Sequence, residues 1–176
     1  MSGGIDSTAC AHFLLAQGLK VRGIFFDYGQ AAAHSELIAA TDVASSLCIP
    51  LATYTVSGAD RYSGGELLGR NAFLIFTALF LGRCHSGLLA LGIHHGTPYY
   101  DCSSVFIEAA EQLIAEHTAG RTSLATPFRA WRKQDIVAYA VSAHVPLHLT
   151  YSCELGVDPT CGECLSCRDR ASLRVS

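Results

Sequence analysis

The chain alternates short apolar runs with amphipathic segments along almost its whole length. Apolar runs bounded by turn residues, typical of buried strands, lie at residues 21–26, 51–56 and 88–92. Helical spacing of apolar positions predicts helices at residues 9–16, 35–47, 72–84, 103–116 and 132–143. A polar, glycine-rich loop is expected at residues 57–70, and Asn71 is expected to cap the helix that follows it.

This order of elements predicts an α/β fold. Strands that alternate with helices are typical of a Rossmann-like parallel sheet with helices on both faces and sites at the carboxyl ends of the strands. After Thr150 the chain becomes rich in cysteine. We therefore divide it into a nucleotide-binding domain of residues 1–150 and a metal-binding tail of residues 151–176 that packs on it.

Composition narrows the class of protein. The 176 residues are 50% hydrophobic and 15% charged, which is enough to build one globular domain with a sizeable core. The most apolar stretch, residues 72–81, is shorter than the ~20 residues that cross a bilayer. A net charge of −3 predicts no general nucleic-acid surface. No signal segment opens the chain, so we expect a cytoplasmic protein without membrane association.

The first loop carries a phosphate-binding pattern, Ser-Gly-Gly-x-Asp-Ser. Adjacent glycines let the backbone approach an anion closely, and a helix that starts here presents unpaired amides and a positive dipole end. A carboxylate in such a loop indicates a divalent cation, for which we expect Mg²⁺, or an amide donor. A simple N-cap is the alternative, but a cap needs only one of these residues. The expected phosphate ligands are Ser2, Gly3, Gly4, Asp6, Ser7 and Thr8.

Four cysteines in the tail have the spacing of a metal site. The pattern Cys-x₇-Cys-x₂-Cys-x₂-Cys formed by Cys153, Cys161, Cys164 and Cys167 matches a closed tetrahedral Zn²⁺ site. An iron–sulfur cluster is the main rival, although the proline that often follows such runs is missing. Disulfides are disfavoured in the cytoplasm.

The glycine loop resembles the pyrophosphate loop of the N-type ATP pyrophosphatases, the PP-loop superfamily, whose members adenylate a substrate. Together with four further motifs and the cysteine tail, the chain resembles the 7-cyano-7-deazaguanine synthase family. The motifs are residues 26–30 (Phe-Asp-Tyr-Gly-Gln), 69–71 (Gly-Arg-Asn), 101–102 (Asp-Cys) and 126–127 (Thr-Pro). The resemblance runs in order across nearly the whole chain and implies an adenine nucleotide alpha hydrolase-like fold.

The resemblance implies an ATP-dependent carbon–nitrogen ligase of queuosine-type biosynthesis. Such an enzyme adenylates the carboxylate of 7-carboxy-7-deazaguanine, releases pyrophosphate and uses ammonia to reach 7-cyano-7-deazaguanine. The resemblance does not fix the oligomeric state, for which a homodimer is one option. The expected substrate and catalytic residues are Asp27, Gln30, Arg70, Asn71, His94, His95, Tyr99, Asp101, Cys102 and Lys133.

One loop departs from the family pattern. The family carries an Asn and an Asp before Tyr-Pro-Asp-Cys, whereas residues 92–102 are two residues shorter and carry His94 and His95. This change favours an alternative, a paralogue that transfers the activated deazaguanine to a protein or other macromolecular amine and stops at the amide. tRNA thiolation is a weaker alternative, because it needs a catalytic cysteine pair and a basic surface. A non-enzymatic fragment is the last alternative.

The first strand of the sheet is expected to be missing. In this superfamily a hydrophobic strand precedes the phosphate loop and lies centrally in the sheet, but only Met1 precedes Ser2 here. The gap would leave open strand edges. We therefore expect a functional product with an upstream apolar segment of about five to six residues, a typical strand length.

Overall fold

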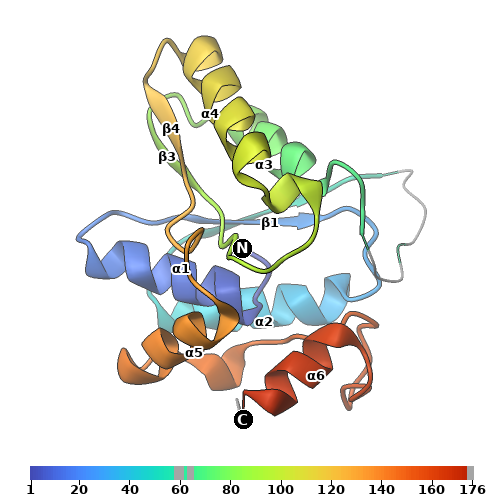
Figure 1. Cartoon of the computed structure of the whole chain (residues 1–176). Coiled ribbons are helices and arrows are strands. Elements are labelled where there is room, and N and C mark those ends of the chain that lie inside the picture. The colour runs from blue at the N-terminus through green and yellow to red at the C-terminus, as the bar shows by residue number, and fades with distance from the viewer. Residues whose placement is uncertain (58–61, 63–65, 174–176) are drawn as a thin grey trace. The chain divides into compact units, whose positions relative to one another are not determined.

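The computed structural model describes residues 1–57, 62 and 66–173 (Figure 1). The chain divides into two compact units, one formed by residues 1–65 and 134–176 and the other by residues 66–133. The cysteine tail therefore shares a unit with the glycine loop. The division at residue 150 stays a prediction.

The described residues of the first unit form a parallel strand pair and four helices. Strands β1 (Gly23–Asp27) and β2 (Leu51–Thr55) pair in register, with Gly23 opposite Leu51 and Asp27 opposite Thr55. Phe25 and Phe26 of β1 are buried, as an apolar strand requires. The helices of this unit are α1 (Ile5–Ala16), α2 (Ala33–Ser46), α5 (Lys133–Ser142) and α6 (Leu165–Ser172), with a 3₁₀ turn at Leu147–Leu149. The first residue of α5, Lys133, belongs to the second unit.

The second unit builds its own core on a second parallel pair. Strands β3 (Gly87–Ala90) and β4 (Thr122–Ala125) pair along their whole length, and helices α3 (Arg70–Leu81) and α4 (Ser104–Thr118) pack on them (Figure 1). A 3₁₀ turn, η1 (Tyr100–Cys102), precedes α4. The buried core consists of Ile75, Leu89, Ile93, Ile107, Ala110, Ile114 and Leu124.

The predicted α/β class and its parallel strands are confirmed, with several corrections. Helix α1 begins at Ile5 rather than at residue 9, because the polar residues after the glycines already belong to its first turn. Helix α3 begins at Arg70 with Gly69 as its N-cap in the left-handed region (φ 75°). The prediction that Asn71 is the cap is therefore wrong. Strand β4 and helix α6 were not predicted. The predicted loop at 57–70 lies partly outside the described residues.

Among the described residues, the parallel ladder is split into two separate pairs. The described residues ahead of Ile5 form no strand. The main-chain nitrogen of Met1 donates to the carbonyl oxygen of Ile24. This is the pairing that a neighbouring strand would continue, and the upstream strand stays a prediction. No helix in the described part of the chain is long and apolar enough to cross a membrane.

Candidate functional site

The glycine loop is seated directly against α2. Gly3 has φ +73°, and a Cβ at this position would lie 2.6 Å from the Ala40 nitrogen and 2.8 Å from the Ala39 Cβ. Only glycine combines this backbone conformation with so close an approach. Gly4 is the N-cap of α1 and provides no side chain for capping. The start of α1 therefore carries no side-chain cap, as expected of a phosphate loop.

Two serine hydroxyls gather at the start of α1. The Oγ atoms of Ser2 and Ser7 lie 3.2 Å apart, and the Ser7 hydroxyl also donates to the Gly4 carbonyl oxygen at 3.1 Å. Asp6 is half-buried in the same first turn. Thr8 differs from the other predicted phosphate ligands, because it is 0% exposed and its hydroxyl has no hydrogen-bond partner among the described residues.

The carboxyl end of β1 is folded into a turn by its own polar side chains. The Asp27 carboxylate accepts from the Gly29 main-chain nitrogen at 3.0 Å, and the side-chain oxygen Oε1 of Gln30 accepts from the Tyr28 main-chain nitrogen at 2.9 Å. The amide of Gln30 also donates to the Glu36 carboxylate at 3.0 Å. Glu36, in the first turn of α2, was not among the predicted site residues. Its position six residues after Gln30 is the sequence feature that could have identified it.

In the second unit, Arg70 and Asn71 meet Asp101 and Cys102. The Asp101 carboxylate accepts from the Asn71 nitrogen at 2.9 Å, and the Asn71 side-chain amide donates to the Asp101 carbonyl oxygen at 2.9 Å. The same amide lies 3.5 Å from the Cys102 sulfur. Asn71 and Asp101 are buried, whereas Arg70, Tyr99 and Cys102 are half-buried.

Burial, followed by the charge of Asp101, raises the pKa of the Cys102 thiol, and the opposing influence of Arg70 is smaller. The thiol is therefore protonated at neutral pH. A protonated thiol is a poor nucleophile, so Cys102 is not an activated cysteine of the kind that thiolation chemistry requires.

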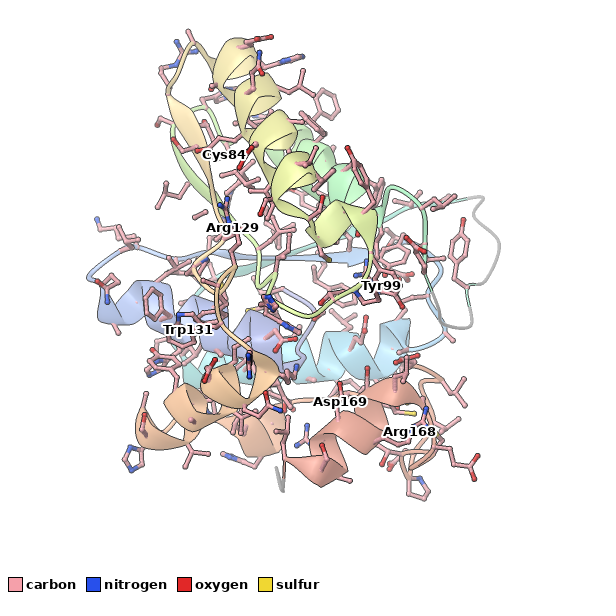
Figure 2. The ribbon with its side chains drawn as sticks, viewed as in Figure 1. Cys84, Tyr99, Arg129, Trp131, Arg168 and Asp169 are labelled. Carbon is pink, nitrogen blue, oxygen red and sulfur yellow. The ribbon has the colours of Figure 1, made fainter. Side chains whose placement is uncertain are left out.

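The histidine loop leaves the carboxyl end of β3. His94 Nδ1 lies 2.9 Å from the His95 carbonyl oxygen, which can only accept, so Nδ1 carries the proton and Nε2 of neutral His94 does not. The main-chain nitrogen of His95 donates to the main-chain carbonyl oxygen of Trp131 at 2.8 Å. Figure 2 shows Trp131 and Arg129 on the segment after β4. His94 is half-buried and His95 exposed, while Lys133, at the start of α5, is half-buried.

The four tail cysteines converge as the spacing predicted. Their sulfur atoms all lie within 4.8 Å of one another, and the sulfurs of Cys161 and Cys167 are 3.9 Å apart. Zinc bound at ~2.3 Å by four tetrahedral sulfurs needs sulfur–sulfur distances of about 3.8 Å, which the Cys161–Cys167 pair matches and the whole cluster approaches. Backbone amides of Cys164 and Cys167 point at the sulfurs of Cys161 and Cys164, at 3.4 Å each.

The two buried cysteines of the cluster have opposite pKa shifts. Burial would raise the pKa of Cys153, but hydrogen bonds from backbone amides, that of Cys161 first, lower it to about 6. Burial and a hydrogen bond with the Cys164 thiol raise the pKa of Cys167 to about 12. The cluster therefore already favours one thiolate, and a cation would favour deprotonation of the others.

The cysteine tail is attached to the rest of its unit at several points. The Tyr151 nitrogen donates to the Gly3 carbonyl oxygen at 3.0 Å, next to the glycine loop. Gly156 has φ +70°, and a Cβ there would lie 2.8 Å from the Ala32 Cα. Arg170 of α6 donates to the Leu147 and Thr150 carbonyl oxygens at 3.1 and 3.0 Å. The tail is therefore an integral part of the first unit.

A cavity of about 320 Å³ lies elsewhere in the second unit. Cys84, His85 and Arg121 line it just ahead of β3 and β4, together with apolar side chains of α3. The predicted substrate residues follow the strands instead, so this cavity is at the opposite end of the pair.

Comparison with known proteins is consistent with these features. The chain matches the family described as queuosine biosynthesis protein QueC over residues 1–69 and 67–173. It is 33% identical to a 7-cyano-7-deazaguanine synthase of Prochlorococcus marinus (strain MIT 9303) over 97% of this chain and 88% of the relative. Enzymes of the same name from Parasynechococcus marenigrum (strain WH8102) and Aquifex aeolicus (strain VF5) are 34% and 29% identical, over 99% and 97% of this chain and 90% and 92% of the relatives.

The relatives are longer within the aligned region. The alignment with the Prochlorococcus enzyme extends over 202 residues, more than the 176 of this chain, so it contains gaps in this chain. The two segments of the family match meet at residues 67–69, directly before α3.

Proposed function

The chain belongs to the queuosine biosynthesis protein QueC family, and from this we propose that it is an ATP-dependent carbon–nitrogen ligase that makes 7-cyano-7-deazaguanine. The observation that carries the proposal is the extent of the family match, which includes both the glycine loop and all four tail cysteines. A PP-loop protein of another substrate class would share the loop without the tail.

The proposed reaction has two adenylation steps. The carboxylate of 7-carboxy-7-deazaguanine attacks the α-phosphorus of ATP and displaces pyrophosphate, giving an acyl-adenylate. Ammonia then adds to the acyl carbon, AMP leaves and a proton is lost, so that a primary amide forms. The amide oxygen attacks a second ATP, pyrophosphate leaves again, and loss of AMP and protons gives the nitrile. Each nitrile therefore accounts for two ATP and two pyrophosphate.

We propose that the glycine loop holds the ATP phosphates. The amides at the start of α1 and the hydroxyls of Ser2 and Ser7 provide donors for phosphate oxygens, and Gly3 and Gly4 permit close backbone approach. Asp6, in the first turn of α1, would bind Mg²⁺ together with the phosphates, because a carboxylate is a preferred ligand of this cation. Thr8 is retained in the set, although its enclosed hydroxyl would have to become accessible before it could reach a phosphate. Mg²⁺ would neutralise charge that develops on the departing pyrophosphate.

We propose that Asp27, Gln30, Arg70, His94, His95, Tyr99 and Lys133 serve the substrate and its activation. His94 offers an unprotonated Nε2 when neutral, which suits a hydrogen-bond acceptor or a base toward ammonium. Arg70 and Lys133 provide positive charge for phosphate or carboxylate oxygens. The cysteine cluster is proposed to hold a structural Zn²⁺, because four sulfur ligands leave no open coordination position.

Pyrophosphate release measured with product mass analysis tests the function. Purified protein is incubated with ATP, Mg²⁺, ammonium and 7-carboxy-7-deazaguanine, and pyrophosphate and product are quantified together. We expect two pyrophosphate per nitrile. One pyrophosphate per amide, with no nitrile, would contradict the proposed product, and no acid-dependent pyrophosphate would contradict the proposed activity.

The relatives give no support to the paralogue that transfers deazaguanine to a protein or other macromolecular amine. The same assay with a protein acceptor in place of ammonium would detect such a conjugate by mass. We propose the cytoplasm as the compartment, because Cys10, Cys48, Cys84 and Cys102 are free thiols. The homodimer stays a prediction for light scattering to check.

A further inference from the structure

The N-terminus of α3 is capped by a residue far away in the sequence. Its own N-cap, Gly69, has no side chain to offer. The carboxylate of Asp101, thirty residues later, accepts from the Asn71 nitrogen at 2.9 Å and so takes the place of a capping side chain. The Asn71 side-chain amide donates in return to the Asp101 carbonyl oxygen at 2.9 Å.

These two bonds form a reciprocal clasp, which we define as Asn71, Asp101 and the Cys102 thiol. Each bond joins a side chain of one residue to the main chain of the other, so the clasp ties the start of α3 to η1 in both directions. The Cys102 thiol closes it, with its sulfur 3.5 Å from the Asn71 amide nitrogen and 3.7 Å from an Asp101 oxygen.

The clasp leaves little polar capacity for a ligand. Asn71 is 5% exposed and Asp101 is 7% exposed. Both carboxylate oxygens of Asp101 are already engaged, one by the Asn71 nitrogen and the other by the Cys102 thiol. A buried carboxylate that serves as a helix cap has no need of a substrate to satisfy it.

We propose that Asn71 and Asp101 are positioning residues rather than substrate ligands. By fixing the start of α3 to η1, the clasp sets where Arg70, the first residue of the helix, and Tyr99, the residue before η1, stand relative to each other. Arg70 and Tyr99 are both half-buried, so they keep surface with which to contact a substrate. The catalytic part of this inference rests on the proposed function, whereas the clasp itself does not.

The test compares Asp101→Ala, Asn71→Ala and Asp101→Asn. The first two variants each remove one of the two bonds, and a displaced Arg70 should lower kcat/KM for the deazapurine acid by about 10- to 100-fold. Asp101→Asn should recover part of the loss, because its carbonyl oxygen can still accept from the Asn71 nitrogen. Asn71→Ala retains the hydrogen bond from the main-chain nitrogen of residue 71 to the Asp101 carboxylate. It therefore tests the proposal even if Asp101→Ala does not fold.

A matched control separates positioning from general stability. Thr122→Val removes a buried hydroxyl that donates to the Cys84 carbonyl oxygen at 3.0 Å, in the same unit but at the first residue of β4, the end of the strand away from the clasp. We expect it to lower the melting temperature as the clasp variants do while leaving kcat/KM per folded molecule unchanged. If the clasp variants also leave kcat/KM unchanged, the positioning role is wrong. If Asp101→Asn is as inactive as Asp101→Ala, the charge itself acts on the substrate and the proposal is wrong.

A second readout does not depend on activity. The rate at which iodoacetamide alkylates Cys102, followed by peptide mass spectrometry, should rise several-fold in Asp101→Ala because the thiol loses both burial and its charged neighbour. An unchanged rate would overturn the clasp. If the rate rises but the wild-type protein releases no acid-dependent pyrophosphate, the clasp is supported and the proposed function is the part that fails.

Discussion

Gly3 combines a left-handed backbone with a contact that leaves no room for a side chain. A Cβ at Gly3 would lie within 3 Å of both Ala39 and Ala40 of α2. We expect Gly3→Ala to lower the free energy of unfolding by about 2–4 kcal/mol, the sum of backbone strain and overpacking. Gly18 provides the control, since its φ is +78° and nothing lies within 4 Å of its missing Cβ.

Gly18→Ala should cost only the strain of the left-handed conformation, about 1–2 kcal/mol. Urea unfolding of both variants measures the difference. Equal losses of unfolding free energy in the two variants would mean that α2 moves to accommodate the added methyl group. The close contact between the glycine loop and α2 would then not be rigid.

Asp6 permits a test of the phosphate site that leaves the fold intact. The residue is half-buried in the first turn of α1. If its carboxylate binds Mg²⁺ beside the ATP phosphates, Asp6→Ala should abolish acid-dependent pyrophosphate release and shift the melting temperature little. Circular dichroism of the variant is the control for folding. Full activity in a folded variant would remove Asp6 from the site.

His94 can be compared with a histidine in a similar hydrogen bond but a different place. His94 Nδ1 lies 2.9 Å from the His95 carbonyl oxygen, and His117 Nδ1 on α4 lies 2.9 Å from that of Leu113. If His94 acts as a base, His94→Ala should lower kcat/KM by about 100-fold or more, whereas His117→Ala should change it little. Unchanged kinetics in His94→Ala and in His95→Ala would show that the histidine loop has no catalytic part.

At the scale of single elements, an arginine of α6 joins this helix to the segment before the cysteine cluster. Arg170 donates to the Leu147 and Thr150 carbonyl oxygens and to the hydroxyls of Thr150 and Ser152. Arg168 is exposed on the same helix (Figure 2). We expect Arg170→Met to destabilise the protein by about 2–3 kcal/mol, because the charged hydrogen bonds of the guanidinium to two carbonyl oxygens and two hydroxyls are lost. Arg168→Met should be near neutral in the same thermal melts; similar losses would contradict this role of Arg170.

The sequence predicts most elements to within two residues, but it misses one short strand and one short helix. Helices α2, α4 and α5 were placed within two residues at each end, because each carries several turns of apolar periodicity. Strand β4 has only four residues, too few for alternation to stand out, and α6 is mostly polar. The start of α3 was misplaced because its capping group comes from Asp101, which local sequence does not reveal.

At the scale of the whole chain, the two units should respond differently to loss of metal. Zinc binding to Cys153, Cys161, Cys164 and Cys167 would stabilise the first unit directly, since the ligands must be brought together to bind it. We expect one zinc per chain, and we expect a chelator to expose the amides of residues 151–173 to hydrogen exchange while those of β3 and β4 stay protected.

Two variants control this experiment. Cys164→Ser should lose the metal, whereas Cys48→Ser, which changes an exposed cysteine outside the cluster, should keep it. Iron in the purified protein, or equal exchange in both units, would contradict the assignment.

The parts of the candidate site also differ in how far the sequence reveals them. The phosphate loop and the cysteine cluster can be recognised from the sequence because the residues of each are close together in the chain. Contacts such as Gln30 with Glu36, or Asn71 with Asp101, depend on how separate elements pack. The resemblance to the family motifs therefore identified Asn71 and Asp101 as candidate site residues, but it did not predict that they bind each other.

Gly156 has a consequence for protein engineering. Its α-carbon approaches the segment before α2 so closely that a Cβ would lie 2.8 Å from the Ala32 Cα, and the Ser35 hydroxyl donates to its carbonyl oxygen at 3.3 Å. The cysteine tail therefore cannot be moved to another protein as an independent module. Grafted alone onto another scaffold, it would lack the surface that shapes it, and a functional transplant would have to carry residues 31–35 as well.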